Sequence, residues 1–443
     1  MTTHPALTNC TAVNPPRKLN ETWMLSNCTM AICEGNNIIS VVPMTCPSVQ
    51  PITCQNGRPP KKVYDKFDCC YHYECDCICS GWGDPHYLTF DGTYYTFQGN
   101  CTYILVKQIT EVIENFKIYL ENYFCDAQEG LSCPKAITIF YKSSVITLTQ
   151  SIIKGNIKTK VLLNNNEIVQ PFEEDFLRIT TSNIAVKAEI IDINATIIFD
   201  GMSFIVILPY KIFGENTEGQ CGTCTNDRKD DCTLPDGTQV SSCSHAAGFW
   251  YTEDKSKPYC EAPSPTVIPP SQPTKQTTTP IDCEPLDVCK IILSDIFAEC
   301  HNIIPPGPFH EACIFDGCRM KNTTVDCSSL ATYAQMCKLQ AGICVNWRES
   351  TNGECPYTCP DTMIYEPCGP KQQLTCSLRY TDKSTWRDES TFTEGCFCPD
   401  GKFLFVQLDM CVDVCGKLIS FFPPVEGLYF SFLLLMVQFH KHS

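Results

Sequence analysis

Residues 79–101 read Cys-Ser-Gly-Trp-Gly-Asp-Pro-His-Tyr-Leu-Thr-Phe-Asp-Gly-Thr-Tyr-Tyr-Thr-Phe-Gln-Gly-Asn-Cys, and they give the clearest indication of how this chain folds. From Tyr87 to Lys107, apolar and polar residues alternate on either side of Asp91-Gly92. Alternation places successive side chains on opposite faces of a strand, and Asp-Gly is a favoured two-residue hairpin turn. The stretch therefore predicts two antiparallel strands joined at Asp91-Gly92.

The segment that follows is rich in β-branched and aromatic residues. Such runs occupy residues 136–149, 176–191 and 195–208, and a second Asp-Gly pair at Asp200-Gly201 interrupts the last of them. Residues 134–220 contain no cysteine, so these strands must be stabilised by a packed apolar core rather than by disulfides. We predict an antiparallel β-sandwich for this part of the chain.

Cysteine is the most unusual component of the composition. The chain contains 34 cysteines among 443 residues, and five of them fall within residues 69–79. Only eight histidines are present, and none has the spacing to cysteine pairs that zinc fingers require. An even number of clustered cysteines at this density indicates a disulfide framework that forms in an oxidising compartment.

Six Asn-x-Ser/Thr sequons agree with passage through the secretory pathway, where such asparagines are glycosylated. They are Asn9, Asn20, Asn27, Asn100, Asn194 and Asn322. Residues 1–25 contain no apolar run of seven or more, so no signal peptide is evident. We therefore expect a piece of a longer secreted, extracellular glycoprotein.

The formal net charge of −16 argues against nucleic acid and anionic membranes as partners. Binding of divalent cations or packing at acidic pH would fit this charge, and so would a solvated acidic surface without a partner. Residues 417–443 form an atypical apolar tail, which Pro423-Pro424 and Glu426 interrupt. About a dozen uninterrupted apolar residues remain, fewer than the roughly twenty that span a bilayer. We expect no membrane anchor, and we interpret the tail as a non-native ending.

The remaining regions differ in composition. Thirteen of residues 261–281 are Pro, Ser or Thr, which is typical of an extended, O-glycosylated linker. Apolar residues recur at helical spacing between Val288 and Cys300, and again over residues 331–339. Residues 355–416 hold eight cysteines and show almost no periodicity. Disulfides rather than an apolar core should hold that last region together.

Two blocks resemble the ends of a von Willebrand factor type D domain. Residues 79–101, continued by Thr-Tyr-Ile-Leu, resemble its opening. Gly219-Gln-Cys-Gly-Thr-Cys-Thr-Asn-Asp-Arg-Lys-Asp-Asp-Cys232, followed by Leu-Pro-Asp-Gly-Thr, resembles its end. The cysteines from Cys289 to Cys344, ending in Val-Asn-Trp-Arg, resemble the eight-cysteine module, and residues 355–416 resemble the trypsin-inhibitor-like module.

This order resembles the D assembly of gel-forming mucins and von Willebrand factor, over about residues 69–416. Cys221-Gly-Thr-Cys224, with Thr-Asn-Asp after it, is most similar to the fourth assembly of an intestinal-type mucin. The likeness stops after Cys415-Gly416, and the dimerising cystine knot of that family is absent from this sequence. Its dimerising function is therefore not carried over.

The resemblance implies a mainly β, multi-module and disulfide-rich chain. An antiparallel β-sandwich D domain would be followed by a small helical cysteine-rich module and a small irregular one. The expected regions are a cysteine-rich N-terminal region (1–78), the D-like domain (79–260), a Pro/Thr/Ser linker (261–282), the eight-cysteine module (283–348), the inhibitor-like module (349–416) and the apolar tail (417–443).

The tetrapeptide Gly83-Asp84-Pro85-His86 is a candidate site of self-cleavage. A protonated Asp84 carboxyl can attack its own main-chain carbonyl, and the tertiary amide nitrogen of Pro85 leaves more readily than a secondary one. Low pH or a pKa raised by burial would favour this reaction, and His86 could supply a proton. Some gel-forming mucins are cleaved at this tetrapeptide. The alternative is that the tetrapeptide only turns the chain into the first strand.

A calcium site is a second expectation, and it rests on the resemblance. D domains often hold one Ca²⁺ between the Asp of the Phe-Asp-Gly turn and an acidic loop after Cys-Gly, since Ca²⁺ takes six to eight oxygen ligands. The matching residues here are Asp91, Asp230 and Asp231. Thr223 and Thr225 stand where the family commonly has Asn or Asp, and Asn226 replaces a Gly, which weakens the match. An acidic hairpin turn without metal remains the alternative.

We interpret the conspicuous cysteines as structural. They include Cys79, Cys101, Cys221, Cys224 and Cys232, and their pairing cannot be read from the sequence. A thioredoxin-like role for Cys221-x-x-Cys224 is disfavoured because no βαβ pattern surrounds it. Protease inhibition through Arg379 or Arg387 of the inhibitor-like module is the less favoured alternative.

No Ser/His/Asp grouping, phosphate loop or metalloprotease helix occurs in the sequence, so we do not expect a turnover enzyme. The favoured interpretation is a structural component of a mucus-type gel, whose partners are copies of itself or other mucin chains. The rival interpretation is an adhesive or ligand-binding D-domain glycoprotein.

Overall fold

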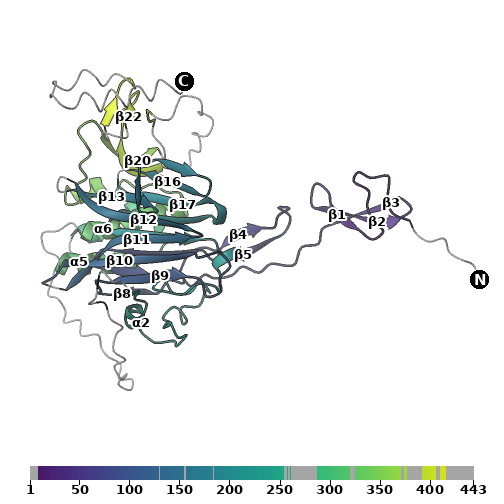
Figure 1. The fold of residues 1–443 in the computed structure, drawn as a ribbon, viewed down its shortest axis with the longest axis horizontal. Coiled ribbons are helices and arrows are strands. Elements are labelled where there is room, and N and C mark those ends of the chain that lie inside the picture. Colours follow the sequence, from purple (N-terminus) through teal and green to yellow (C-terminus); the bar gives the residue numbers. More distant parts are fainter. Residues whose placement is uncertain are drawn as a thin grey trace, which may run out of the picture.

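A computed structural model of the chain describes residues 8–415, apart from 129, 154–155, 183, 254–256, 258–259, 261–286, 320–324, 371–373, 377–391 and 406–409. The described part is mainly β, with a helical unit and many disulfides, which confirms the predicted fold class. Two large antiparallel sheets form its body (Figure 1). The predicted linker and apolar tail lie outside the described residues, and no described helix is long and apolar enough to cross a membrane.

The first sheet has six strands in the order β14-β13-β12-β11-β10-β9, and each strand pairs with its neighbour in sequence. Its strands are β9 (Thr102–Lys107), β10 (Lys117–Asp126), β11 (Leu131–Tyr141), β12 (Ser144–Ile153), β13 (Asn156–Leu163) and β14 (Asn166–Ile168). The β-branched run at 136–149 forms most of the β11–β12 hairpin, with Ile139 opposite Ile146.

The second sheet has eight strands in the order β15-β16-β17-β18-β19-β6-β7-β8. Its strands are β6 (Cys77–Trp82), β7 (His86–Leu88), β8 (Tyr94–Thr96), β15 (Phe172–Glu174), β16 (Leu177–Thr181), β17 (Val186–Ile190), β18 (Ala195–Phe199) and β19 (Ser203–Leu208). The two Asp-Gly pairs lie in the predicted turns, between β7 and β8 and between β18 and β19. The pairing of β19 with β6 joins the end of this domain to its beginning.

The eight-stranded sheet is buried on both faces, which is why β6 has no exposed residue. Cys77 and Cys79 point into the core between the two sheets, together with Phe199. Ile78 and Trp82 point the other way, into a second core shared with the helices. This alternation follows from the two-residue repeat of a strand. Two short helices, α1 (Tyr210–Phe213) and α2 (Cys243–Phe249), complete this domain.

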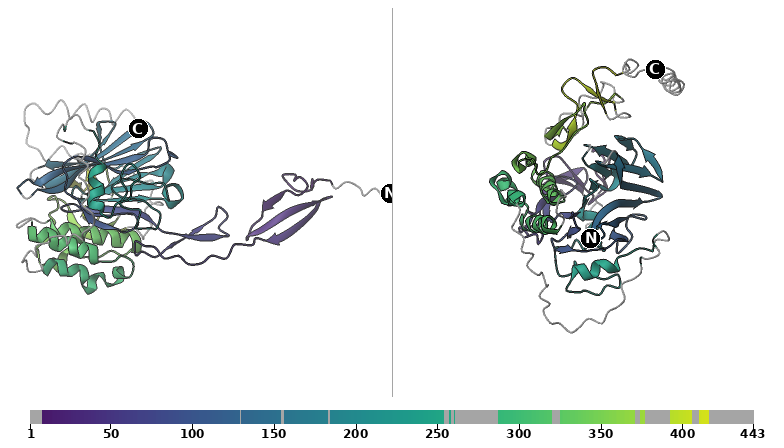
Figure 2. Two further views of the ribbon diagram at one scale, coloured as in Figure 1. Left: turned by 90° about the horizontal axis from the view of Figure 1, so that it is seen from below. Right: turned by 90° about the vertical axis from the view of Figure 1, so that its left-hand side faces the viewer.

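The helical unit covers the outer face of this sheet (Figure 2). It consists of α3 (Asp287–Lys290), η2 (Ile291–Leu293), η3 (Asp295–Phe297), α4 (Ala298–His301), α5 (Gly307–Arg319), α6 (Asp326–Ala341) and η4 (Arg348–Thr351). The helical spacing between Val288 and Cys300 does not produce one helix, because Ser294 is extended and divides it into short pieces. Helix α6 contains the second predicted helical stretch, whereas α5 had not been predicted.

Residues 1–79 show little periodicity, which predicts a loop-rich region, and the structure places strands among these loops. The region contains one three-stranded sheet, β1 (Thr22–Met24), β2 (Thr29–Gly35) and β3 (Ile38–Pro43), and one hairpin, β4 (Lys61–Tyr64) and β5 (Tyr71–Glu74). Asn36 and Asn37 both have positive φ, at 52° and 62°, and form the two-residue turn between β2 and β3. Loops still make up most of the region, as predicted, and the Asn-Asn turn is the local signal for the β2–β3 hairpin. Figure 1 shows the β1–β3 sheet well away from the body.

The C-terminal unit has little core of its own. Its strands are β20 (Ile364–Pro370), β21 (Phe392–Phe397), β22 (Phe403–Phe405) and β23 (Met410–Val412). Its small apolar cluster consists of Met363, Cys396, Leu404 and Cys411. Disulfides Cys359–Cys396 and Cys398–Cys411 cross-link it, as expected for a unit with so few apolar residues.

Candidate functional site

Disulfides close the D domain onto itself. Cys77 pairs with Cys224 and Cys79 with Cys221, so two adjacent bonds connect β6 to the loop after α1. Cys101 pairs with Cys260, and Cys232 with Cys243. Cys221 and Cys224 therefore bond to different partners and not to each other, so they are not a reversible dithiol pair in this structure.

Other disulfides join the units that follow. Cys355, which the sequence analysis placed in the third module, pairs with Cys327 of α6. Cys344 pairs with Cys368 of β20, whereas Cys376–Cys415 lies within the C-terminal unit. Disulfides therefore cross-link the helical and C-terminal units to each other. No cysteine in the described ranges is free. Arg379 and Arg387 lie outside those ranges.

In the tetrapeptide Gly83-Asp84-Pro85-His86, the first three residues form the turn between β6 and β7, and His86 begins β7. Gly83 has a φ of +62°, a conformation that favours glycine. The buried Asp84 carboxyl accepts hydrogen bonds at Oδ1 from Gln98 Nε2 at 2.8 Å and from the Ser132 main-chain N–H at 3.1 Å. Its Oδ2 has no hydrogen-bond partner among the described residues. Burial raises the pKa of Asp84 above its usual value, so the protonated acid persists to higher pH than in an exposed aspartate.

His86 is fully buried and both of its ring nitrogens have partners. Nε2 lies 2.7 Å from Oδ1 of Asp316, and Nδ1 lies 2.8 Å from the Tyr94 hydroxyl. Asp316 belongs to α5, and burial raises its pKa to about 6. Sequence reasoning missed Asp316 because 230 residues separate it from His86 and α5 had not been predicted.

The D domain meets the helical unit directly beside this turn. Trp82 stacks on Phe309 of α5, with ring centroids 4.6 Å apart. Its indole Nε1 donates a hydrogen bond of 3.0 Å to Ser329 Oγ of α6. Both aromatic rings are fully buried. The Asp84-Pro85 bond therefore lies at the interface of two units rather than on an exposed loop.

The three predicted calcium ligands come together, with ligand oxygens within 4.8 Å of one another. Asp91 follows β7, and Asp230 and Asp231 lie in the loop after Cys224. Oδ2 of Asp231 accepts hydrogen bonds from the Thr89 and Thr93 hydroxyls at 2.7 and 2.6 Å. Its Oδ1 is buried without a hydrogen-bond partner in the described structure. Burial raises the pKa of Asp231 to about 8.

Thr223 and Thr225 take part in the same cluster. Oδ2 of Asp91 accepts hydrogen bonds from the Thr225 main-chain N–H at 3.0 Å and from its hydroxyl at 2.9 Å. The Thr223 hydroxyl donates to Asp230. Three clustered carboxyl groups and one buried, unpartnered oxygen fit a hard divalent cation such as Ca²⁺. Hydroxyl and main-chain oxygens could complete its coordination.

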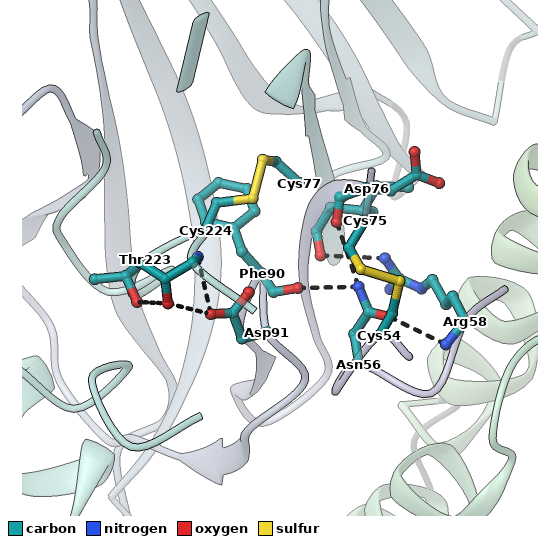
Figure 3. The surroundings of a disulfide bond; sticks show 12 residues. Cys54, Asn56, Arg58, Cys75, Asp76, Cys77, Phe90, Asp91, Thr223 and Cys224 are labelled. Carbon is teal, nitrogen blue, oxygen red and sulfur yellow. Dashed lines mark hydrogen bonds between the residues drawn. A yellow bond between two sulfur atoms is a disulfide. The ribbon is translucent and has the colours of Figure 1, made fainter. Parts of the chain in front are cut away.

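A segment of the N-terminal region packs against this cluster (Figure 3). The disulfide Cys54–Cys75 fixes the segment, and Asn56 Nδ2 donates a hydrogen bond to the Phe90 carbonyl at 3.3 Å. Arg58 is buried beside it, and burial lowers the pKa of its guanidinium to about 10. Gln55 of the same segment accepts a hydrogen bond at Oε1 from the Arg228 main-chain N–H at 3.0 Å, so the segment also supports the acidic loop from outside the D domain.

The sequons differ in exposure. Those at Asn9, Asn20, Asn27 and Asn194 are exposed, Asn100 is partly buried, and Asn322 lies outside the described residues. Four of the predicted glycosylation sites are therefore sterically accessible in this structure.

Comparison with known proteins agrees with this architecture. Residues 79–238 match the von Willebrand factor type D domain, and residues 288–356 match the C8 domain. The chain carries a D domain and a C8 domain. Their matched ranges contain the Asp84-Pro85 turn and Asp316, respectively, so the His86–Asp316 contact joins the two domains.

Similar proteins include several mucins. The chain is 43% identical to human Mucin-5AC over 424 residues, which is 91% of this chain and 7% of Mucin-5AC. It is 41% identical to mouse Mucin-2 over 92% of this chain and 9% of that protein. It is also 41% identical to a rat intestinal mucin-like protein over 93% of this chain and 48% of that protein. The chain is thus homologous to mucins over most of its length, and it spans less than half the length of each of these relatives.

Proposed function

We propose that this chain is a structural node of a secreted, mucus-type gel, equivalent to the fourth D assembly of a gel-forming mucin. The observation that carries the proposal is the disulfide network, which closes the D domain with Cys77–Cys224 and Cys79–Cys221 and joins the C8 domain to the unit after it. Cross-links of this kind keep a protein compact in an oxidising, protease-rich environment. Such a role requires no catalytic turnover.

The absence of free cysteines from the described ranges bears on its partners. We propose that this part of the chain associates with other copies or with other mucin chains through non-covalent contacts.

Expression in animal cells and limited proteolysis test the node. We expect the secreted chain to migrate as a monomer on non-reducing gels and to resist trypsin, except within residues 261–282. Reduction and alkylation should make the whole chain susceptible. Rapid degradation of the D domain with its disulfides intact, or disulfide-linked dimers formed through the described cysteines, would refute the proposal.

We also propose acid-triggered self-cleavage at Asp84-Pro85. The unpartnered Oδ2 and the raised pKa of Asp84 support it, because the reaction needs a protonated carboxyl that is free to attack. In this step Oδ2 bonds to the Asp84 main-chain carbonyl carbon, the bond to the Pro85 nitrogen breaks, and the carboxyl proton moves to that nitrogen. The products are a cyclic anhydride at Asp84 and a free proline amine, and water or another nucleophile then opens the anhydride.

Intact mass spectrometry of the reduced protein tests this reaction. Fragments that end at Asp84 and begin at Pro85 should form at mildly acidic pH in the parent chain and not in Asp84→Ala. Under non-reducing conditions the fragments should stay together, because Cys77–Cys224 and Cys79–Cys221 connect them. An intact parent chain at every pH would remove the proposal.

Finally, we propose that Asp91, Asp230 and Asp231 bind Ca²⁺. The buried, unpartnered Oδ1 of Asp231 supports this assignment. A bound cation would connect the β7–β8 turn to the loop that carries Cys221 and Cys224, and it would stabilise the fold rather than take part in chemistry.

A further inference from the structure

The turn that contains the Asp84-Pro85 bond is completed by a residue of the C8 domain. Asp316 lies on the buried side of α5, and its side chain is 0% exposed, as is that of His86. Its Oδ1 lies 2.7 Å from His86 Nε2. The other oxygen, Oδ2, lies against the turn itself, since a Cβ placed on Gly83 would be 2.2 Å from it. One carboxyl group therefore contacts both sides of the bond that is proposed to break.

The same contact restrains the imidazole ring of His86. With Asp316 ionised, Nε2–H of His86 donates to the carboxylate and the Tyr94 hydroxyl donates to Nδ1. Removing Asp316 would leave the ring held only by Tyr94 and by ring contacts such as the one with Phe315, whose centroid lies 5.4 Å away. Asp316 thus determines both the ring orientation and which nitrogen carries the proton.

Charge at Asp316 also affects Asp84. Two carboxyl groups that share a buried site favour retention of a proton on one of them, because like charges repel strongly when water is excluded. Each has an unpartnered Oδ2 among the described residues. The titratable and charged groups around Asp316 are His86, Asp84 and Tyr94 from the D domain and Glu311 and Arg319 from α5 itself. Burial, together with the Asp84 carboxylate, raises the pKa of Asp316 to about 6, so Asp316 takes up a proton at mildly acidic pH and then no longer carries a negative charge beside Asp84.

We propose that Asp316 of the C8 domain is a positioning residue for scission of the Asp84-Pro85 bond, so that the bond breaks only when C8 is docked on the D domain. This inference rests on the proposed self-cleavage. It deepens that proposal by making the reaction depend on a second domain. A D domain without its C8 domain in place would lack the group that orients His86 and restrains Gly83.

The test uses the full chain in four forms: the parent, Asp316→Asn, Asp316→Glu and Ser329→Ala. Ser329→Ala is the matched control, because it removes the hydrogen bond from Trp82 at the same interface without touching His86. Each protein is incubated between pH 4.5 and 8, and the rate of fragment formation at Asp84-Pro85 is measured by mass spectrometry after reduction.

We expect Asp316→Asn to slow scission by about tenfold to a hundredfold, since a misplacement of about 1 Å can cost that much. Its pH profile should also lack the step near pH 6 at which Asp316 titrates in the parent. Asp316→Glu should restore such a step even if its rate is lower. Ser329→Ala should keep the parent's pH profile and a rate within about twofold of it, by the same positional argument.

The outcomes separate the two proposals. Equal rates and equal pH profiles for the parent and Asp316→Asn would overturn the role of Asp316 and leave self-cleavage standing. A loss of rate in Ser329→Ala as large as in Asp316→Asn would show that loosened docking, not Asp316, is responsible. If the parent is as stable as Asp84→Ala at every pH, self-cleavage fails and this inference fails with it.

Discussion

The adjacent disulfides Cys77–Cys224 and Cys79–Cys221 should not contribute independently to stability. In the chain-entropy account, a disulfide stabilises the folded state by closing a loop in the unfolded chain. With either bond present, the other closes a loop of fewer than ten residues, because residues 77 to 79 are already tied to residues 221 to 224. That loop length corresponds to about 2.5 kcal/mol. Each single deletion, with both partners changed to Ala, should lower the free energy of unfolding by about this amount.

Deleting both bonds should cost more than the sum of the two single deletions. The shortest remaining connection between the two segments then runs through Cys101–Cys260 and encloses roughly sixty residues, and the bond that closes such a loop contributes about 4 kcal/mol. The total loss is therefore about 7 kcal/mol, with a coupling of about 2 kcal/mol. Loss of buried sulfur contributes similarly to each pair and largely cancels from the coupling.

Guanidinium unfolding of the purified chain, with its remaining disulfides intact, provides the assay. The buried residues Trp82 and Trp250 report on the D domain by fluorescence. Additive losses in the double deletion would refute the loop-closure reasoning. They would indicate instead that each bond acts through local packing in the folded state.

Three further predictions concern the interface and the acidic loop. Trp82→Ala should lower the free energy of unfolding by about 3–5 kcal/mol through lost packing on Phe309, whereas Ser329→Ala should cost about 1 kcal/mol; chemical denaturation measures both, and equal losses would contradict the packing argument. Burial raises the pKa of Asp316 to about 6, so its contribution to the free energy of unfolding is complete below pH ~4 and is lost as the pH rises through about 6. Between pH 4 and pH 8, the free energy of unfolding of Asp316→Asn should therefore fall by about 3 kcal/mol less than that of the parent. Parallel stability curves for these two proteins would argue against that shift. Millimolar Ca²⁺ should raise the Tm of the parent and of the exposed-site control Asp236→Asn but not of Asp231→Asn; an equal rise in all three, measured by differential scanning fluorimetry, would place the cation elsewhere.

Much of the fold could be predicted because its signals are local. Alternation along residues 136–149 and 195–208 and the two Asp-Gly turns depend only on neighbouring residues. The extended Ser294, which divides the expected helix, and the Asn36-Asn37 turn are also local, but propensity alone did not reveal them. Local signals therefore predict the long strands well and the short elements poorly.

The candidate sites also differ in how far the sequence could predict them. The acidic cluster was anticipated because a family resemblance matched Asp91 with Asp230 and Asp231, and the structure brings their carboxyl groups together. Asp316 could not be anticipated, because its meeting with His86 depends on how α5 docks on the eight-stranded sheet. Contacts between domains leave no pattern in the spacing of residues along one chain.

The disulfides that enclose the D domain have a mechanical consequence. If the chain is pulled from both sides, tension that arrives at Cys77 passes directly through the sulfur–sulfur bond to Cys224 and bypasses the 147-residue separation between them. The β-sandwich then bears no load, and its unfolding cannot lengthen the chain. The Asp84-Pro85 bond lies within the segment that this disulfide bypasses, so its scission would leave the load-bearing path unbroken. A gel built from such nodes would draw its extensibility from the segments between them.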